Sequence, residues 1–144
     1  MLATRTFWEK ATAIHVFCRQ GRFRGGYRFA RHWYDIARLD DAGIADEALA
    51  DRALALDFAR HKQYFFAEKG DDGDPIDYRA VVGGGLMLVP DGAAREALVE
   101  DYTQMVADGL ILGAAPAFDE LMERCAGLAD KANKTALPTP EDDG

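Results

Sequence analysis

Apolar residues near the start of the chain recur at helical spacing and predict a helix over residues 6–20. The repeating positions share one face and are Phe7, Ala11, Ile14 and Cys18. Thr6 and Glu9 form a T-x-x-E pattern, in which each side chain satisfies a free backbone amide at a helix start. Lys10 lies beside the apolar face rather than in it, so we expect the fold not to depend on Lys10.

Four more segments have the composition and periodicity of helices. They are expected over residues 28–40, 46–68, 91–108 and 116–132. The segment 46–68 is rich in alanine and leucine, which favour helix, and we expect a bend near Asp57. Asp91 follows a proline and precedes an apolar pattern, so it is the expected N-cap of the next helix.

The inner faces of these helices should form the core. The positions expected to be buried are Phe29, Trp33, Ile36 and Ala37 in the second helix, Leu98, Val99, Tyr102, Met105 and Val106 in the fourth, and Phe118, Leu121, Met122, Cys125 and Leu128 in the fifth. The glycine-rich stretch 80–90 is expected to be a short extended connector. We therefore predict an all-α fold, a bundle of about five helices. It should form one helical domain over residues 1–133, followed by a disordered acidic tail over 134–144.

Composition places the chain among ordinary globular proteins and excludes several classes. Its 144 residues are 49% hydrophobic and 29% charged, enough for one domain with a buried core. The longest uncharged stretch, AVVGGGLMLVP, is shorter than a membrane span, and MLATRTFWEK has no signal-peptide pattern. We therefore expect a cytoplasmic protein without a membrane partner. Cys18 and Cys125 are expected as reduced core thiols, and three scattered histidines predict no metal site.

Charge is distributed unevenly along the chain. Residues 1–38 hold eight Lys or Arg against two acids, a net charge of +6. Residues 39–144 hold nine bases against 23 acids, a net charge of −14, which gives −8 for the whole chain. This asymmetry favours a localised anion-binding site over general coating of nucleic acid. A solvated basic helix face explains the charge equally well.

Lys10 and Asp35 are expected at similar depths on neighbouring helices. If the first two helices pack antiparallel, Lys10 is about 15 Å and Asp35 about 10 Å below the connecting loop, from a rise of about 1.5 Å per residue. We therefore predict that the two side-chain ends lie within roughly 8 Å of each other, close enough for direct or water-bridged contact. Such a contact is either a structural ion pair or half of a site that grips a phosphate, and most such pairs are structural.

Six short blocks follow one another along the chain: RTFWEKATAIH, RFARHWYDIARL, HKQYFF, LVP, EDYTQM and PAFDEL. In this order, from about Arg5 to Asn133, they resemble the C-terminal half of the AbiEii/AbiGii toxin family of nucleotidyltransferases. The resemblance implies that Lys10 contacts a nucleoside triphosphate and that Asp35 completes the active site beside it. It also implies a relation to polymerase-β-type transferases, which move a nucleotide onto an acceptor.

The resemblance also gives the basic cluster a role. The residues expected to bind triphosphate or RNA backbone are Arg22, Arg24, Arg28, Arg31 and His32. Tyr34 is a nearby candidate for stacking on a base. For the complete family enzyme the resemblance implies magnesium, a nucleoside triphosphate and an RNA acceptor such as tRNA, with a cognate antitoxin as protein partner.

The family's preceding half, with its glycine–serine turn and paired metal-binding carboxylates, is not found in these 144 residues. In-line nucleotidyl transfer depends on metals that clamp the attacking and leaving oxygens. We therefore expect the chain alone to be inactive while it keeps weak affinity for triphosphates. Ala30 and Trp33 also depart from the family pattern, where serine and tyrosine are usual. The alternatives are a non-catalytic helical module that binds a nucleotide, RNA or a protein, and a remnant without function.

Overall fold

The computed structural model describes residues 3–21, 30–65, 68–70, 73–109 and 116–136. Its helices are α1 Ala3–Gln20, α2 Arg31–Asp41, α3 Ile44–Ala50, α4 Arg52–Phe65, α5 Tyr78–Ala80, the π-helical segment η1 Val81–Gly85, α6 Gly92–Ala107 and α7 Phe118–Ala136. The prediction of an all-α fold is confirmed, because these described ranges contain no β-strand. The predicted number of about five helices is wrong, since seven α-helices form in the described part of the chain.

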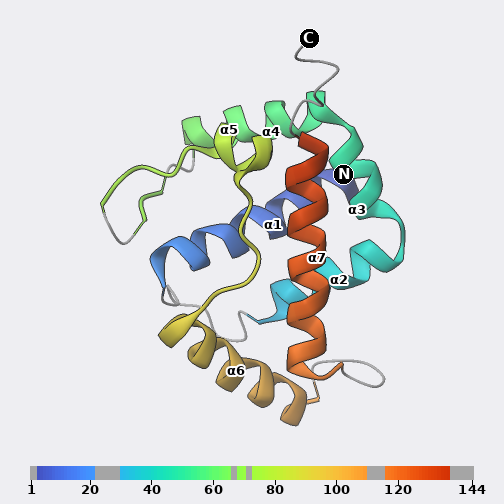
Figure 1. Cartoon of the computed structure of the whole chain (residues 1–144), viewed down its shortest axis with the longest axis vertical. Helices are drawn as coiled ribbons and strands as arrows, with labels where there is room; N and C mark the ends of the chain where they lie inside the picture. The colour runs from blue at the N-terminus through green and yellow to red at the C-terminus, as the bar shows by residue number, and fades with distance from the viewer. Residues whose placement is uncertain (1–2, 22–29, 66–67, 71–72, 110–115, 137–144) are drawn as a thin grey trace.

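The long helix α7 crosses the front of the molecule, with α1 passing behind it (Figure 1). In the same view α4 and α5 lie towards one end of α7 and α6 towards the other, and α1 and α2 run in opposite directions. The largest fully buried side chains are Trp8, Trp33, Tyr78, Phe7, Phe17, Ile14, Ile36, Leu49, Ile76, Leu88, Leu98 and Met105. They come from α1, α2, α3, α5, α6 and the segments before α5 and α6. Phe58 of α4 and Leu121 of α7 belong to the same cluster of buried residues, so the helices share one core.

Two buried tryptophans fix the first helices against the rest of the chain. Trp8 Nε1 donates to the Ala48 carbonyl at 3.3 Å, which joins α1 to α3. Trp33 Nε1 donates to the Leu88 carbonyl at 2.8 Å, which joins α2 to the segment before α6. The ring of Phe17 meets Trp33 edge to face, with centroids 5.5 Å apart. These contacts set how α1 and α2 face each other.

The first helix begins earlier than its capping pattern indicated. α1 starts at Ala3, so Thr6 and Glu9 lie inside the helix and the predicted capping box is wrong. A threonine inside a helix can bond back to a carbonyl of the preceding turn, as Thr12 does with the Trp8 carbonyl at 2.8 Å. The predicted end at residue 20 is confirmed.

The single helix expected over 46–68 is two helices, α3 and α4, with the break at Asp51. The backbone of Asp51 leaves the helical region, with φ −87° and ψ 85°. Its Oδ1 accepts a hydrogen bond of 3.0 Å from the Leu54 amide, so Asp51 caps the start of α4. α4 is continuous through Asp57, near which a bend is expected, and the break between the two helices lies at Asp51.

The expected extended connector over 80–90 is helical in its first part. α5 and η1 occupy residues 78–85, and only 86–91 are free of helix. Asp77 Oδ1 accepts from the Arg79 and Ala80 amides and so starts the turn. Gly84 ends it with φ 125°, a conformation that favours glycine.

The last two helices agree with the sequence in position. α6 and α7 overlap the predicted ranges, although α7 continues to Ala136, three residues past the expected domain end. Val99 and Val106, both expected in the core, are exposed, because α6 is covered on one side alone. The other positions expected to be buried are buried or half-buried, except that Phe29 lies outside the described residues. The expected tail beyond Ala136 also lies outside them.

Candidate phosphate-binding site

Lys10 on α1 and Asp35 on α2 form a direct ion pair. Lys10 Nζ lies 3.1 Å from Asp35 Oδ2, so the prediction of proximity is confirmed. The two side chains keep about a quarter of their surface exposed, 27% for Lys10 and 26% for Asp35. Lys10 reaches Asp35 because α2 packs against α1 through Phe17 and Trp33. The pair is therefore partly shielded by protein yet open to a ligand from solvent.

Arg31 is a second cation on the same carboxylate. Its Nε lies 3.8 Å from Asp35 Oδ2, and it precedes Asp35 by one helical turn of α2. Its side chain is 63% exposed. With Lys10 and Arg31 positive and Asp35 negative, the cluster has a net charge of +1. Lys10 lies at a half-buried position, where a cation interacts more strongly with an anion than an isolated surface residue does.

The start of α2 is held by a residue that is distant in sequence. Ala30, at the N-cap position, offers no side-chain cap, and its backbone amide donates to Asp101 Oδ2 of α6 at 2.7 Å. This contact joins residues 71 positions apart and fixes the first turn of α2, which carries Arg31. Sequence reasoning missed Asp101 as a positioning residue, although it lies in the EDYTQM block.

His32 lies on the first turn of α2, within electrostatic reach of the ion pair. Burial lowers its pKa, and the nearby Lys10 ammonium lowers it further, while Asp35 acts in the opposite direction. His32 is therefore neutral at pH 7 and adds no cationic charge. Its expected phosphate-binding role remains a prediction, and it would act through a hydrogen bond.

The other predicted phosphate-binding residues cannot be placed. Arg22, Arg24 and Arg28 lie outside the described residues, and their roles stay predictions.

The cluster does not have the ligand set of a magnesium site. Magnesium binds carboxylate and other oxygen ligands, whereas Asp35 contributes one carboxylate that contacts two cations. Across the described ranges no group of three or more His, Cys, Asp or Glu side chains could hold a metal ion. Nor is any described helix long and apolar enough to cross a membrane.

The two cysteines are free thiols with poor access to solvent. Burial raises the pKa of Cys18 to about 12 and that of Cys125 to about 12. The thiolate is the reactive form, so neither residue is a nucleophile at neutral pH.

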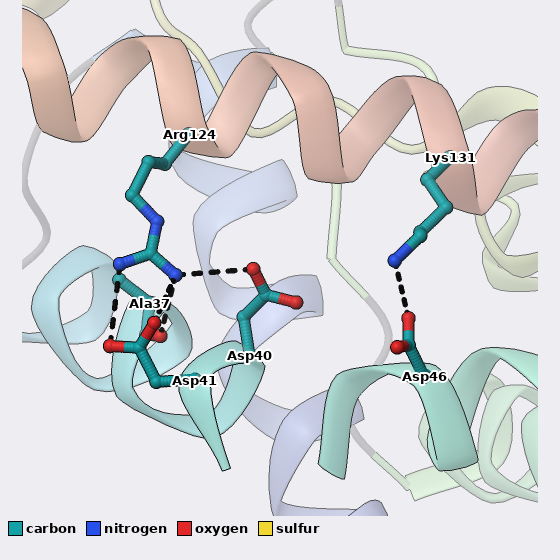
Figure 2. A network of polar contacts seen from close by, with 6 residues as sticks. All are labelled: Ala37, Asp40, Asp41, Asp46, Arg124 and Lys131. Carbon is teal, nitrogen blue, oxygen red and sulfur yellow. Dashed lines mark hydrogen bonds and ion pairs between the residues drawn. The ribbon is translucent and has the colours of Figure 1, made fainter. Parts of the chain in front are cut away.

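A second ionic cluster connects α7 to the end of α2 (Figure 2). Arg124 Nη2 lies 2.7 Å from Asp41 Oδ1 and 3.2 Å from Asp40 Oδ2. The same nitrogen donates to the Ala37 carbonyl at 3.2 Å, and Nη1 donates to Asp41 Oδ2 at 3.4 Å. The hydrogen bond to Asp41 is the main cause of the raised pKa of Arg124. This guanidinium is engaged on both of its terminal nitrogens and acts as a clamp.

Farther along the same face of α7, Lys131 forms an ion pair with Asp46 of α3 (Figure 2). The two contacts together hold α7 against α2 and α3. Their geometry is that of structural support, because each cation is matched or outnumbered by carboxylates.

The described residues form an all-helical fold, and Lys10, Arg31 and Asp35 form a cluster with a net charge of +1 on its surface. Residues 2–124 match the family described as Nucleotidyl transferase AbiEii toxin, Type IV TA system. Because the match spans most of the 144 residues, the chain belongs to this family of toxins from type IV toxin–antitoxin systems. Comparison with curated proteins and with solved structures gave no match.

Proposed function

We propose that this chain supplies the helical, triphosphate-contacting part of a toxin nucleotidyltransferase of the AbiEii type, which transfers a nucleotide to RNA. The observation that carries the proposal is the 3.1 Å contact between Lys10 and Asp35. These are the two positions that the resemblance assigns to the active site. Membership of the family supports the proposal independently of the geometry.

In this proposal Lys10 contacts the triphosphate. Its ammonium is a compact charge that can approach several phosphate oxygens at once. Arg31 adds a planar guanidinium on the exposed side of the same cluster. Asp35 holds the Lys10 side chain in place before the ligand arrives, so less side-chain entropy is lost on binding. Arg22, Arg24 and Arg28 are proposed to extend the phosphate- or RNA-binding surface.

The magnesium-binding carboxylates belong, in this proposal, to a segment outside these 144 residues. In a complete enzyme magnesium would stabilise the attacking and leaving oxygens of the transfer. The chain alone should therefore bind triphosphates weakly without turning them over. An RNA such as tRNA is the proposed acceptor, and a cognate antitoxin is the proposed protein partner.

A non-catalytic binding module is the second candidate. The observation in its favour is that both cations contact the same oxygen of Asp35, an arrangement that also suits a structural ion pair. Such a module would hold a nucleotide, RNA or a protein without chemistry.

The proposed function is tested with the isolated chain, magnesium, labelled nucleoside triphosphates and total tRNA, alongside a titration of triphosphate binding. The titration separates it from a module that binds only a protein. We expect salt-sensitive binding, because phosphate contacts are screened by ions. We also expect no label in RNA above a Lys10→Ala control. Lys134→Ala is the matched control for loss of a lysine. Lys134 lies on the surface of α7 and, within the described part of the chain, forms an ion pair with Asp130 alone.

Incorporated label that depends on Lys10 would contradict the expected inactivity. If the wild-type chain shows no salt-sensitive binding at millimolar triphosphate, the nucleotide-binding role fails and a protein-binding module or a remnant is favoured.

A further inference from the structure

The exposed face of α2 continues beyond the ion pair. Helical spacing places Arg31, Tyr34, Asp35 and Arg38 on one face, because they lie three or four positions apart. Arg31 and Arg38 are separated by seven residues, a distance of about 10 Å along the helix axis. The face therefore offers a second polar group about two turns from the first cation.

Tyr34 and Arg38 form a single unit on this face. Arg38 Nη1 donates to the Tyr34 hydroxyl at 3.0 Å. The centre of the guanidinium lies 5.8 Å from the ring centroid, near the outer limit of a cation–π contact. The hydrogen bond to the hydroxyl and the contact with the ring together fix the guanidinium at the hydroxyl end of Tyr34. Tyr34 itself is half-buried and packs against the core, so its ring is held in place from below.

We propose that the Tyr34–Arg38 unit binds the nucleoside end of the triphosphate whose phosphates are held by Lys10 and Arg31. This inference rests on the proposed function. A phenol ring and a planar guanidinium both stack on the faces of nucleobases, whatever the base. The unit joins a ring and a planar guanidinium, both of which can stack on a base beside the phosphate-directed cations.

The position of the unit agrees with this role. A triphosphate bound at Lys10 and Arg31 would extend its nucleoside along α2 or away from it. Along the exposed face the order is Arg31, Tyr34, Asp35 with its partner Lys10, and then Arg38. The phosphate-directed cations and the planar groups are thus adjacent on one surface.

The test compares two ligands, inorganic tripolyphosphate and nucleoside triphosphates, by calorimetric titration of the full chain. Two variants keep the net charge: Arg38→Lys removes the planar fork, and Tyr34→Leu removes the ring but keeps apolar bulk against the core. We expect each to weaken binding of nucleoside triphosphates about three- to tenfold, as for loss of one net polar contact. Binding of tripolyphosphate should not change.

Matched controls come from the exposed side of α4. Arg60→Lys and Tyr64→Leu make the same substitutions at surface positions, Tyr64 being 82% exposed, and should change neither affinity. If Tyr34→Leu proves to be unfolded by circular dichroism, Arg38→Lys decides, because Arg38 is an exposed residue.

The possible results test the nucleoside assignment and the proposed function separately. Equal weakening of both ligands by Arg38→Lys or Tyr34→Leu, or no weakening of either, would overturn the nucleoside assignment and leave the proposed function standing. A wild-type chain that does not bind tripolyphosphate, or a Lys10→Ala variant that binds it equally well, would overturn the proposed function itself.

Discussion

The two ends of α2 carry ionic clusters built from the same residue types with opposite net charge. At the first end, Lys10 and Arg31 surround Asp35, two cations and one carboxylate, for a sum of +1. At the other end, Arg124 is bound by Asp40 and Asp41, one cation and two carboxylates, for a sum of −1. Both contain a contact near 3 Å, so distance alone does not tell them apart.

The difference in net charge favours the first cluster over the second as the candidate anion site. Arg124 also donates to the Ala37 carbonyl, and an incoming phosphate there would meet two carboxylates. At the first cluster a phosphate would meet two cations that share one carboxylate oxygen. Excess charge at a half-buried position, rather than the presence of an ion pair, therefore identifies the candidate site.

The stability of the fold at low pH sets the range in which the two clusters can be compared. We expect the protonation of His15 to have the largest effect on that stability. This residue is buried, and its Nδ1 accepts a hydrogen bond of 3.0 Å from the Met87 amide. Burial, assisted by Arg19, lowers its pKa from 6.5 to about 4. The unfolded chain therefore takes up a proton first as the pH falls. Stability is full above pH 6.5 and decreases by about 3 kcal/mol as the pH approaches 4.

Urea unfolding at a series of pH values, compared with His15→Asn, measures this effect. The Asn side chain can offer an oxygen to the Met87 amide but does not titrate, so the variant should lose less stability between pH 6.5 and 4. The lowered pKa of His32 acts in the same direction, and some dependence will remain. If the free energy of unfolding of His15→Asn falls with pH as steeply as that of the wild type, His15 is not the main cause of the pH dependence.

The stabilising role of the second cluster is tested next. Arg124→Ala should lower the free energy of unfolding by about 2 kcal/mol, because it removes several charge-assisted hydrogen bonds and leaves two carboxylates close together. Lys10→Ala should cost less than about 1 kcal/mol, the usual size for a partly exposed pair. Arg124→Lys should recover part of the loss, since it keeps the charge but not the fork. If Arg124→Ala and Lys10→Ala lower the free energy of unfolding equally, the second cluster is not more important for stability than the first.

The parts of the fold that the sequence could predict are those whose signals are local. Apolar periodicity located α1, α6 and α7, because each has a face buried against the core. The break at Asp51 was missed because alanine and leucine on both sides favour one continuous helix, and a single capping aspartate decides otherwise. The turn at 78–85 was missed because valine and glycine there resemble an extended connector. Asp77 starts the turn locally, and Asn133 of α7 fixes the residue after it by bonding both the amide and the carbonyl of Leu86.

The same limit applies to the site. The Lys10–Asp35 contact could be predicted from helix rise and a short connection. The cap from Asp101 and the clamp at Arg124 could not, since these partners are 71 to 87 positions away from the groups they bind. Contacts between residues so far apart in the sequence depend on how the helices pack, so a local sequence pattern cannot predict them.

Binding should reverse the order of the two variants. Lys10→Ala is expected to weaken tripolyphosphate binding about tenfold, the loss of one charge-assisted contact. Arg124→Ala should leave this binding nearly unchanged, because Arg124 belongs to the other cluster. Calorimetric titration at low and moderate salt measures both. If Arg124→Ala weakens tripolyphosphate binding as much as Lys10→Ala does, phosphate binding depends on overall charge or on general stability. The first cluster would then not be a specific phosphate site.

The smallest expected effect concerns a pair that belongs to neither cluster. Lys134 Nζ lies 3.0 Å from Asp130 Oδ2, one turn away on the exposed side of α7. Exposed pairs of this spacing contribute about 0.3 kcal/mol and are screened by salt. Lys134→Ala should therefore change the urea midpoint only slightly, less at high salt, and should not affect tripolyphosphate binding. If Lys134→Ala costs as much stability as Arg124→Ala, the number of acceptors around a cation does not govern its contribution. Arg124 would then contribute no more to the attachment of α7 than an exposed ion pair does.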